Sequence, residues 1–345
     1  MNSLDKQYQD LLQDILDNGV KKETRNGGTK SIFGYTIRHN MSEGFPVLTT
    51  KKMAWKTMVT ELLWFLRGDS DIRFLWENNC TIWDGDWEKH YKTTCSKPYT
   101  LEEVKQKVKD GNHNFHDSMF DMGPIYGKQW RQWSAGSLED KHGFGKIDQI
   151  TNLINDLKTN PDSRRLMVSA WNPADLEASV LPPCHYGFQV YTRELSLEER
   201  RSLVSQEVFN KIYNGGGPDT LSHSEINQWN IPTRAISLMY NCRSQDVPLG
   251  TPFNLASYGL LLIILAKEVN MVPEELISNM GDCHIYLNQI DGVKEQLTRE
   301  PFELPTLNPF PNYEGSRPSI ESYVISDFTL KNYQSHPSIK IPLSN

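Results

Sequence analysis

A long apolar helix predicted over residues 255–269 is the feature that most constrains the fold of this chain. The chain has no uninterrupted apolar run of the roughly 18 residues that a membrane span needs. With 38% hydrophobic and 23% charged residues over 345 positions, its composition is typical of a soluble globular protein. We therefore expect one large domain or two small ones, and no disordered chain.

Hydrophobic periodicity predicts further helices and several strands. Apolar residues indicate helices over 3–20, 53–66 and 147–158, and a short helix without a deep apolar face is expected over 101–109. Apolar runs and alternation indicate strands over 31–38, 166–171, 186–192, 235–240 and 280–286. The polar segments 88–118 and 196–230 interrupt this pattern, so we expect them to be surface insertions.

Residues 181–189, Leu-Pro-Pro-Cys-His-Tyr-Gly-Phe-Gln, place a thiol next to an imidazole. Cys184 is a candidate nucleophile, because the thiolate is the reactive form and a nearby cation or helix N-terminus lowers the pKa of a thiol. The alternative is that Cys184 is an inert, small hydrophobic residue. This stretch alone does not decide between the two, so the decision rests on its surroundings.

Arginines stand beside a glycine loop and beside strand ends. Arg25 lies on a polar glycine loop, Arg164 and Arg165 precede a predicted strand, and Arg243 with Ser244 follows another. A guanidinium binds phosphate oxygens through two parallel hydrogen bonds, so each place is a candidate anion site. The alternative is that these arginines are solvated or salt-bridged surface charges.

Glu61 is a carboxylate inside the strongly apolar helix 53–66. The pattern alone favours an outward-facing side chain. The alternative is a buried carboxyl group with a raised pKa and an acid–base task. Trp83 and Trp87 lie on a predicted polar turn, where two indoles belong either to the core or to a stacking platform for a flat ring.

Asn254 stands where the helix 255–269 is predicted to begin and is a candidate N-cap. Its amide also offers one donor group and one acceptor, which suits the imide edge of a uracil. His284 and Tyr286 are two positions apart on a predicted strand, so they lie on the same face of it.

Charge and residue spacing exclude several functions. The net charge is −7, so no overall basic field favours nucleic acid, and a bound phosphate must be met by a local arginine cluster. The five cysteines and nine histidines show no metal-ligand spacing, so no metal is expected. No glycine motif for dinucleotides or phosphate loops occurs. The N-terminus has no apolar signal core, so a cytoplasmic location is expected by default.

Several motifs, in this order along the chain, resemble those of the thymidylate synthase family. They are Gly-Pro-Ile-Tyr-Gly-Lys-Gln-Trp-Arg, Asp-Ser-Arg-Arg, Leu-Pro-Pro-Cys-His, Pro-Phe-Asn-Leu-Ala-Ser-Tyr and Gly-Asp-Cys-His-Ile-Tyr. The resemblance covers nearly the whole chain apart from 88–118 and 196–230. It implies one α/β (α+β) domain over residues 1–345, with a mixed β-sheet flanked by helices. It also implies a homodimer with back-to-back sheets, in which each site is completed by the partner subunit.

The resemblance implies a role for each candidate residue. Cys184 would add to C6 of dUMP, Glu61 would organise water and proton transfers, and Tyr126 would help to remove the C5 proton. Arg164 and Arg165 would reach the phosphate of the other subunit's site, and Arg243 and Asn254 would serve catalysis as well as binding. The residues implied for dUMP are Arg25, Arg164, Arg165, His185, Arg243, Ser244, Asp246, Asn254, His284 and Tyr286. Those implied for the folate are Ile82, Trp83, Trp87, Asp246, Gly250 and Phe253.

The implied reaction converts dUMP to dTMP, with 5,10-methylenetetrahydrofolate as the donor of one carbon and of a hydride. Uracil C5 is a weak nucleophile, and adding a thiolate across C5–C6 turns it into an enolate that can attack the methylene group. Four arginines around one phosphate would keep the Cys184 thiol ionised. Water must be kept out during the final hydride transfer.

The alternative reaction is that of a dUMP hydroxymethylase, in which water instead of hydride adds to the exocyclic methylene and gives 5-hydroxymethyl-dUMP. Cys242 stands where the family usually has Gln, Pro248 where it usually has Phe, and Asn345 where it ends in a small apolar group that closes over the folate. Trp83, which shields the methylene, favours the synthase. A non-catalytic RNA-binding role, with 196–230 as an interaction arm, lacks a basic and aromatic stripe.

Overall fold

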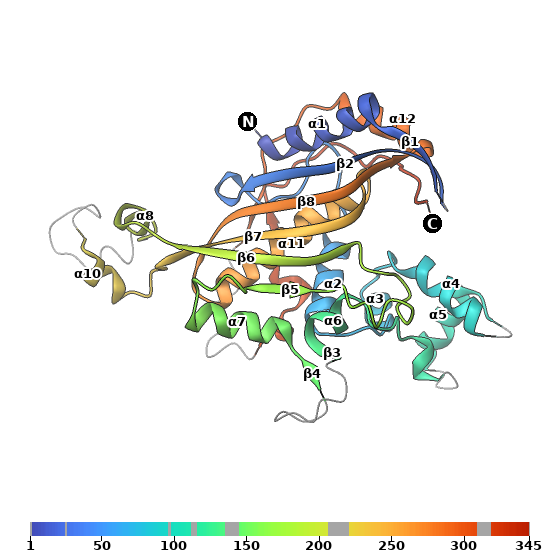
Figure 1. Cartoon of the computed structure of the whole chain (residues 1–345), viewed down its shortest axis with the longest axis horizontal. Helices are drawn as coiled ribbons and strands as arrows, with labels where there is room; N and C mark the ends of the chain where they lie inside the picture. Colours follow the sequence, from blue (N-terminus) through green and yellow to red (C-terminus); the bar gives the residue numbers. More distant parts are fainter. Residues whose placement is uncertain are drawn as a thin grey trace.

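The computed structural model describes residues 2–24, 26–95, 98–111, 116–134, 145–205, 221–308 and 319–344. Within these residues a six-stranded sheet of order β1-β2-β8-β7-β6-β5 forms the centre, and helices flank it (Figure 1). Neighbouring strands are antiparallel except β7 and β8, which are parallel. The predicted class, α/β with a mixed sheet flanked by helices, is confirmed.

The elements have the following bounds. The α-helices are α1 Ser3–Asn18, α2 Trp55–Leu66, α3 Arg73–Glu77, α4 Asp84–Thr94, α5 Leu101–Lys109, α6 Tyr126–Gln132, α7 Gln149–Thr159, α8 Leu197–Ser202, α10 His223–Asn227, α11 Gly250–Glu268 and α12 Ile290–Leu297. The strands are β1 Val20–Thr24, β2 Gly27–Asn40, β3 Trp133–Ser134, β4 Lys146–Ile147, β5 Met167–Ser169, β6 His185–Glu194, β7 Arg234–Asp246, β8 Val272–Tyr286, β9 Thr306–Leu307 and β10 Leu330–Lys331. Short 3-10 helices are η1 Met41–Glu43, η2 Asp117–Met119, η4 Leu287–Gln289, η5 Ile320–Ser322 and η6 Ile325–Asp327.

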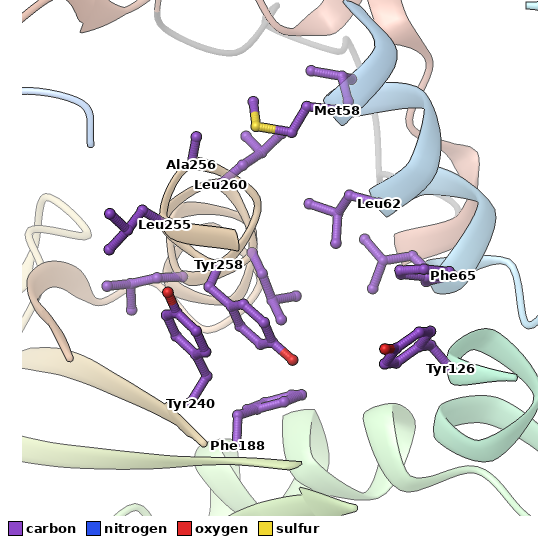
Figure 2. Close-up of a cluster of buried hydrophobic side chains, with 14 of the residues drawn as sticks. Met58, Leu62, Phe65, Tyr126, Phe188, Tyr240, Leu255, Ala256, Tyr258 and Leu260 are labelled. Atoms are coloured by element: carbon purple, nitrogen blue, oxygen red, sulfur yellow. The ribbon is translucent and has the colours of Figure 1, made fainter. Parts of the chain in front are cut away.

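Helix α11 connects the two parallel strands, β7 and β8. Parallel neighbours cannot be joined by a tight hairpin and need a crossover, which is usually a helix. Because α11 is apolar around most of its circumference, it must be covered on all sides. It contacts β7, β8 and α2, and Figure 2 shows its side chains between Tyr240 of the sheet and Leu62 of α2. Among the described residues α11 alone is long and apolar enough to cross a membrane, but 67% of that window is buried in the core.

The register of the sheet separates a covered face from an open one. Hydrogen-bonded neighbours across five strands form one buried row on the helix side: Ile37, Ser278, Tyr240, Phe188 and Val168. The next row points to the other face and is exposed or half-buried: Arg38, Ile277, Met239, Gln189 and Met167. This second face also carries Tyr191, which is 68% exposed. One side of the sheet therefore presents apolar side chains to solvent in the single chain.

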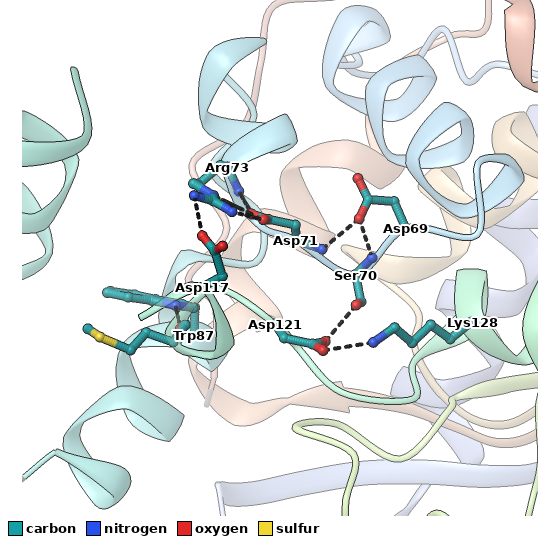
Figure 3. A network of polar contacts seen from close by, with 9 residues as sticks. Asp69, Ser70, Asp71, Arg73, Trp87, Asp117, Asp121 and Lys128 are labelled. Atoms are coloured by element: carbon teal, nitrogen blue, oxygen red, sulfur yellow. Dashed lines mark hydrogen bonds and ion pairs between the residues drawn. The ribbon is translucent and has the colours of Figure 1, made fainter. Parts of the chain in front are cut away.

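A polar network joins the segment after α2 to α6 (Figure 3). Asp121 accepts hydrogen bonds from the Ser70 hydroxyl at 2.6 Å and the Gly123 N–H at 2.9 Å, and pairs with Lys128 at 2.7 Å. Burial alone would raise the pKa of Asp121, but these partners outweigh it and lower the pKa. Gly123 has φ of +76°, and a Cβ there would meet the Ala178 carbonyl oxygen at 2.5 Å. The network fixes the start of α6.

The four predicted helices outside the 255–269 segment are confirmed, as α1, α2, α5 and α7. The predicted strands are also present, but β5 is shorter than the predicted 166–171, and β2, β6, β7 and β8 extend beyond the predicted ranges. Their extra residues are polar or mixed and are held by pairing with neighbouring strands, which a local hydrophobic pattern does not reveal.

Two local expectations are wrong. Helix α11 begins at Gly250 and includes Pro252, which the first turn of a helix tolerates because its missing N–H would have no partner there. Asn254 therefore lies inside the helix and is not its N-cap. Trp87 lies in helix α4, while Trp83 directly precedes that helix.

The two predicted insertions are only partly within the described residues. In 88–118, the end of α4 and α5 are held to the body of the protein by Tyr91 and Val104, both buried. In 196–230, α8 and α10 are joined by Arg200, whose guanidinium contacts His223 and Asn227. This pair of helices projects from the ends of β6 and β7 (Figure 1). Residues 206–220 lie outside the described part.

Candidate active site

Cys184 directly precedes β6, and its backbone is held on both sides. Its N–H donates to the Tyr126 hydroxyl at 2.8 Å, and its carbonyl oxygen accepts from the Arg243 N–H at 2.9 Å. The Arg243 guanidinium donates in turn to the carbonyl oxygens of Pro183 at 2.8 Å and Pro182 at 2.9 Å. The Pro-Pro-Cys segment thus fixes a guanidinium beside the thiol.

Burial raises the pKa of the Cys184 thiol, and the positive charge of Arg243 lowers it only in part. The carboxylates of Asp86 and Asp246 raise it further. The expectation that four arginines, two of them from a partner subunit, keep the thiol ionised stays a prediction, because this structure contains one chain. Among the described residues, Arg243 is the cation that lowers the pKa of this thiol.

His185 does not add a second positive charge beside the thiol. Its ring stacks on Tyr126, with centroids 4.0 Å apart, and Nδ1 lies 2.8 Å from the Tyr258 hydroxyl. Burial lowers the pKa of His185 to about 3, so the imidazole is neutral at physiological pH. Phe65, Tyr126 and Tyr258 contact its ring, and Phe188 packs on Tyr258; together these aromatic residues form the floor of the site (Figure 2).

Glu61 of α2 faces inward, which overturns the outward orientation that the pattern favoured. Its Oε1 accepts the Trp83 indole N–H at 2.7 Å. Burial raises the pKa of Glu61 to about 7, and the hydrogen bond from Trp83 opposes this only in part. A carboxyl group with such a pKa gains and loses a proton near neutrality, which is what acid–base catalysis requires.

The other residues suggested for a flat ring differ in exposure. Trp83 is 5% exposed and contacts Phe65 and Tyr126 edge to face. Trp87 is fully buried, stacks on Tyr91 and donates its indole N–H to the Met119 carbonyl oxygen at 2.8 Å. Ile82 is 37% exposed. Trp83 lies in the aromatic cluster next to His185, whereas Trp87 is part of the core in this chain.

Asn254 projects from the second turn of α11 toward β7. Its Nδ2 donates to Gln245 Oε1 at 3.2 Å and lies 3.8 Å from Cys242 Sγ. Gly250 lies one helical turn before Asn254 on α11, and Phe253 lies one residue before it. Both are half-buried. The local sequence pattern does not mark Gln245 as a functional residue. The one hint in the sequence is that it directly follows Arg243 and Ser244.

A polar pocket of about 410 Å³ lies next to Arg243 and gathers several candidate residues. It is lined by Lys22, Thr24, Asn26, Thr29, Arg243, Ser244, Asp282, His284 and Tyr286. His284 Nδ1 lies 3.1 Å from Asp282, which also pairs with Lys22 at 3.0 Å. Lys22 lies in the short polar strand β1, where nothing in the sequence marks it as a binding residue. The pocket combines cations with hydroxyl and imidazole donors, as an anionic sugar derivative would need.

Asp246 and Lys51 are two charged residues that interact electrostatically beside the site. Burial raises the pKa of Asp246, which accepts hydrogen bonds from Gln289 Nε2 and the Leu249 N–H, both at 3.0 Å. Burial lowers the pKa of Lys51 to about 8, and its ammonium group donates to the Pro248 carbonyl oxygen. Lys51 lies in a polar segment, where nothing in the sequence signals its burial.

The remaining arginines are not brought to Cys184 within one chain. Arg164 and Arg165 are exposed in the turn before β5. Arg25 and Asn345 lie outside the described residues. Among the described residues, no group of three His, Cys, Asp or Glu side chains is placed to hold a metal ion.

The fold and site define an α/β protein with a cysteine between a buried aromatic floor and a polar, partly cationic pocket. The sequence profile of the family described as Thymidylate synthase matches residues 6–212 and 220–345. Thymidylate synthases of three Coxiella burnetii strains, Dugway 5J108-111, RSA 331 / Henzerling II and RSA 493 / Nine Mile phase I, are each 40% identical over 340 residues, which cover 98% of this chain and 99% of theirs. The chain belongs to the thymidylate synthase family. It is therefore an enzyme of the methyltransferase kind, in a family that in general methylates dUMP with a folate co-substrate.

Proposed function

We propose that this chain is a thymidylate synthase that converts dUMP and 5,10-methylenetetrahydrofolate to dTMP and dihydrofolate through a covalent bond between Cys184 and uracil C6. The observation that carries the proposal is the position of Cys184, whose backbone is hydrogen-bonded to Arg243 at the edge of the polar pocket. A pyrimidine over the thiol would place its sugar and phosphate toward that pocket.

The side chains of the site would divide substrate binding and proton transfer among them. The Arg243 guanidinium and the Ser244 hydroxyl would bind the 5′-phosphate, and His284 and Tyr286 the deoxyribose hydroxyl. The Glu61 carboxyl group, with a pKa of about 7, would exchange protons with water at the pyrimidine. The Tyr126 hydroxyl, which accepts the Cys184 N–H, would act at the C5 proton.

Residues 82, 83, 87, 246, 250 and 253 would hold the folate. Trp83 and Glu61 share a hydrogen bond, so the indole that would shield the methylene group is fixed to the proton-transfer residue. Trp87 is fully buried here, and it would support this wall from behind.

We further propose that two chains pair through the open face of the sheet. Phe33 is 88% exposed and lines a hollow with Thr36, Asn241 and Asn279 of that face, where Tyr191 is 68% exposed. Apolar side chains exposed on one sheet face suit a surface that a partner covers. Dimerisation would let Arg164 and Arg165 add positive charge near the Cys184 thiol. The proposed location of this enzyme is the cytoplasm, and no metal or nucleic acid takes part in the proposed reaction.

The second candidate is a dUMP hydroxymethylase. It is favoured by Cys242, whose Sγ lies 3.8 Å from Asn254 Nδ2, and by Pro248, both of which depart from the family pattern. Trp83, buried beside Glu61, favours the synthase because it excludes water from the exocyclic methylene.

One assay separates the candidates. The protein is incubated with dUMP and 5,10-methylenetetrahydrofolate, and dihydrofolate absorbance is followed while the nucleotide product is identified by mass. Formation of dihydrofolate with dTMP supports the synthase. Formation of 5-hydroxymethyl-dUMP without dihydrofolate supports the hydroxymethylase. If neither nucleotide product forms, the protein has a binding role only.

A further inference from the structure

Gln245, near the end of β7, contacts the residue proposed to read the pyrimidine. Its side chain is only 3% exposed, and its Oε1 accepts a hydrogen bond from Asn254 Nδ2 at 3.2 Å. Cys242 Sγ lies 3.8 Å from the same nitrogen. Position 242 is the one where the family pattern has Gln, so in this chain the carboxamide beside Asn254 comes from position 245.

This contact determines which end of the Asn254 amide faces β7. The oxygen and nitrogen of a carboxamide have almost the same shape, so their hydrogen-bond partners decide the orientation. With Nδ2 against Gln245 Oε1, the second N–H and the oxygen Oδ1 of Asn254 are left for a ligand. With Gln245 in this orientation, a flipped Asn254 amide would place two carbonyl oxygens against each other and lose the hydrogen bond.

Gly250 makes room for Gln245. A Cβ at position 250 would lie 2.8 Å from Gln245 Nε2, closer than non-bonded atoms approach. Gly250 is the first residue of α11 and Asn254 is in the next turn. The Gln245 carboxamide is thus packed with its Nε2 against the start of the helix that carries Asn254, and with its Oε1 against Asn254 itself.

The orientation of the Asn254 amide matters because uracil and cytosine present opposite patterns. Uracil offers the acceptor O4 next to the donor N3–H, whereas cytosine offers the donor amino group N4–H₂ next to the acceptor N3. An amide held with one N–H and its oxygen in fixed places matches one of the two bases. A freely flipping amide matches both.

We infer that Gln245 is a positioning residue that selects uracil over cytosine nucleotides by fixing the amide of Asn254. The inference rests on the proposed function, in which Asn254 binds the pyrimidine. It assigns to Gln245 no contact with the reacting atoms. Its effect is on the ratio of affinities for dUMP and dCMP, and a merely structural residue would not change that ratio.

The test measures the dissociation constants of dUMP and dCMP by calorimetry for the full chain, for three variants at position 245 and for one control. Gln245→Met keeps the length of the side chain without a good acceptor, and Gln245→Leu removes the acceptor altogether. Gln245→Glu keeps an acceptor oxygen, and Gln13→Leu, on the exposed side of α1, is the matched control. Melting temperatures of all proteins are recorded, so that a variant that fails to fold is recognised. If either Gln245→Met or Gln245→Leu fails to fold, the comparison with the wild type uses the folded one of the two.

The expected result is a loss of about tenfold in dUMP affinity for Gln245→Met and Gln245→Leu, comparable to one lost hydrogen bond. The dCMP affinity stays the same or rises, so the dUMP/dCMP ratio falls about tenfold, while Gln245→Glu and Gln13→Leu keep the ratio within about threefold. The inference is overturned if folded Gln245→Met or Gln245→Leu keeps the wild-type ratio, or if both nucleotides weaken equally. Failure of the unaltered protein to bind dUMP would instead remove the proposed function itself.

Discussion

Replacing Glu61 by Gln should stabilise the protein at alkaline pH while it removes activity. The pKa of Glu61 rises from an ordinary 4.5 to about 7 because the carboxyl group is buried. A folded-state pKa above the unfolded one means that stability is lost as the pH rises from about 4.5 to about 7, and is constant above that. The shift corresponds to about 3 kcal/mol at pH 8 and to less than about 1 kcal/mol at pH 5.

The assay is urea denaturation of both proteins at pH 5 and pH 8, at equal protein concentration and ionic strength. The carboxamide oxygen that Glu61→Gln introduces can still accept the Trp83 N–H, so the variant should gain about 3 kcal/mol over the wild type at pH 8 and little at pH 5. The exposed Glu303→Gln serves as the control and should show no such pH-dependent gain. A gain of equal size at both pH values, or a loss at pH 8, would refute the argument that burial holds this carboxyl group near neutrality. Turnover should fall by about 10²–10⁴, because an amide cannot exchange a proton.

Three further changes test the site, the core and the assembly. Cys184→Ser should abolish turnover and leave dUMP binding largely intact, as measured by product formation and calorimetry; near-normal turnover would exclude the covalent mechanism. Asp5→Ala should lower the free energy of unfolding by about 3–5 kcal/mol. The reason is that the fully buried Asp5 carboxylate accepts hydrogen bonds from the backbone N–H and hydroxyl groups of Thr49 and Thr50. A change below about 1 kcal/mol in urea denaturation would contradict this. Phe33→Glu should convert a dimer to a folded monomer in light scattering, and an unchanged dimer would exclude the open sheet face as the interface.

Local sequence signals predicted the helices well and the strand limits less well. Helix α1 ends where Asn18 and Gly19 interrupt the apolar spacing, and α5 has the predicted bounds. Strand β8, by contrast, begins at Val272 and includes Glu274 and Glu275, which an apolar or alternating sequence pattern does not predict to be in a strand. These residues are extended because β7 and β2 pair with this strand on both sides. The pairing partners lie elsewhere in the sequence, so the residues of β8 alone do not reveal it.

The candidate site shows the same division. The motif around Cys184 could be found from the sequence, because it carries chemistry in recognisable order. So could four residues of the polar pocket, namely Arg243, Ser244, His284 and Tyr286. The inward orientation of Glu61, the position of Asn254 within α11 and its contact with Gln245 could not. Each depends on packing between segments far apart in the chain, since helix α2 and strand β7 meet α11 only in the folded protein.

Helix α11 has a consequence for how base recognition can change in this protein. Asn254 is carried by the most enclosed helix of the described structure, against a central strand, whereas binding residues in many enzymes lie on surface loops that tolerate insertions. Moving this backbone would disturb the whole interior. A shift in nucleotide preference would therefore arise through exchange of single side chains next to Asn254, such as those at positions 242 and 245, and not through remodelling of a loop.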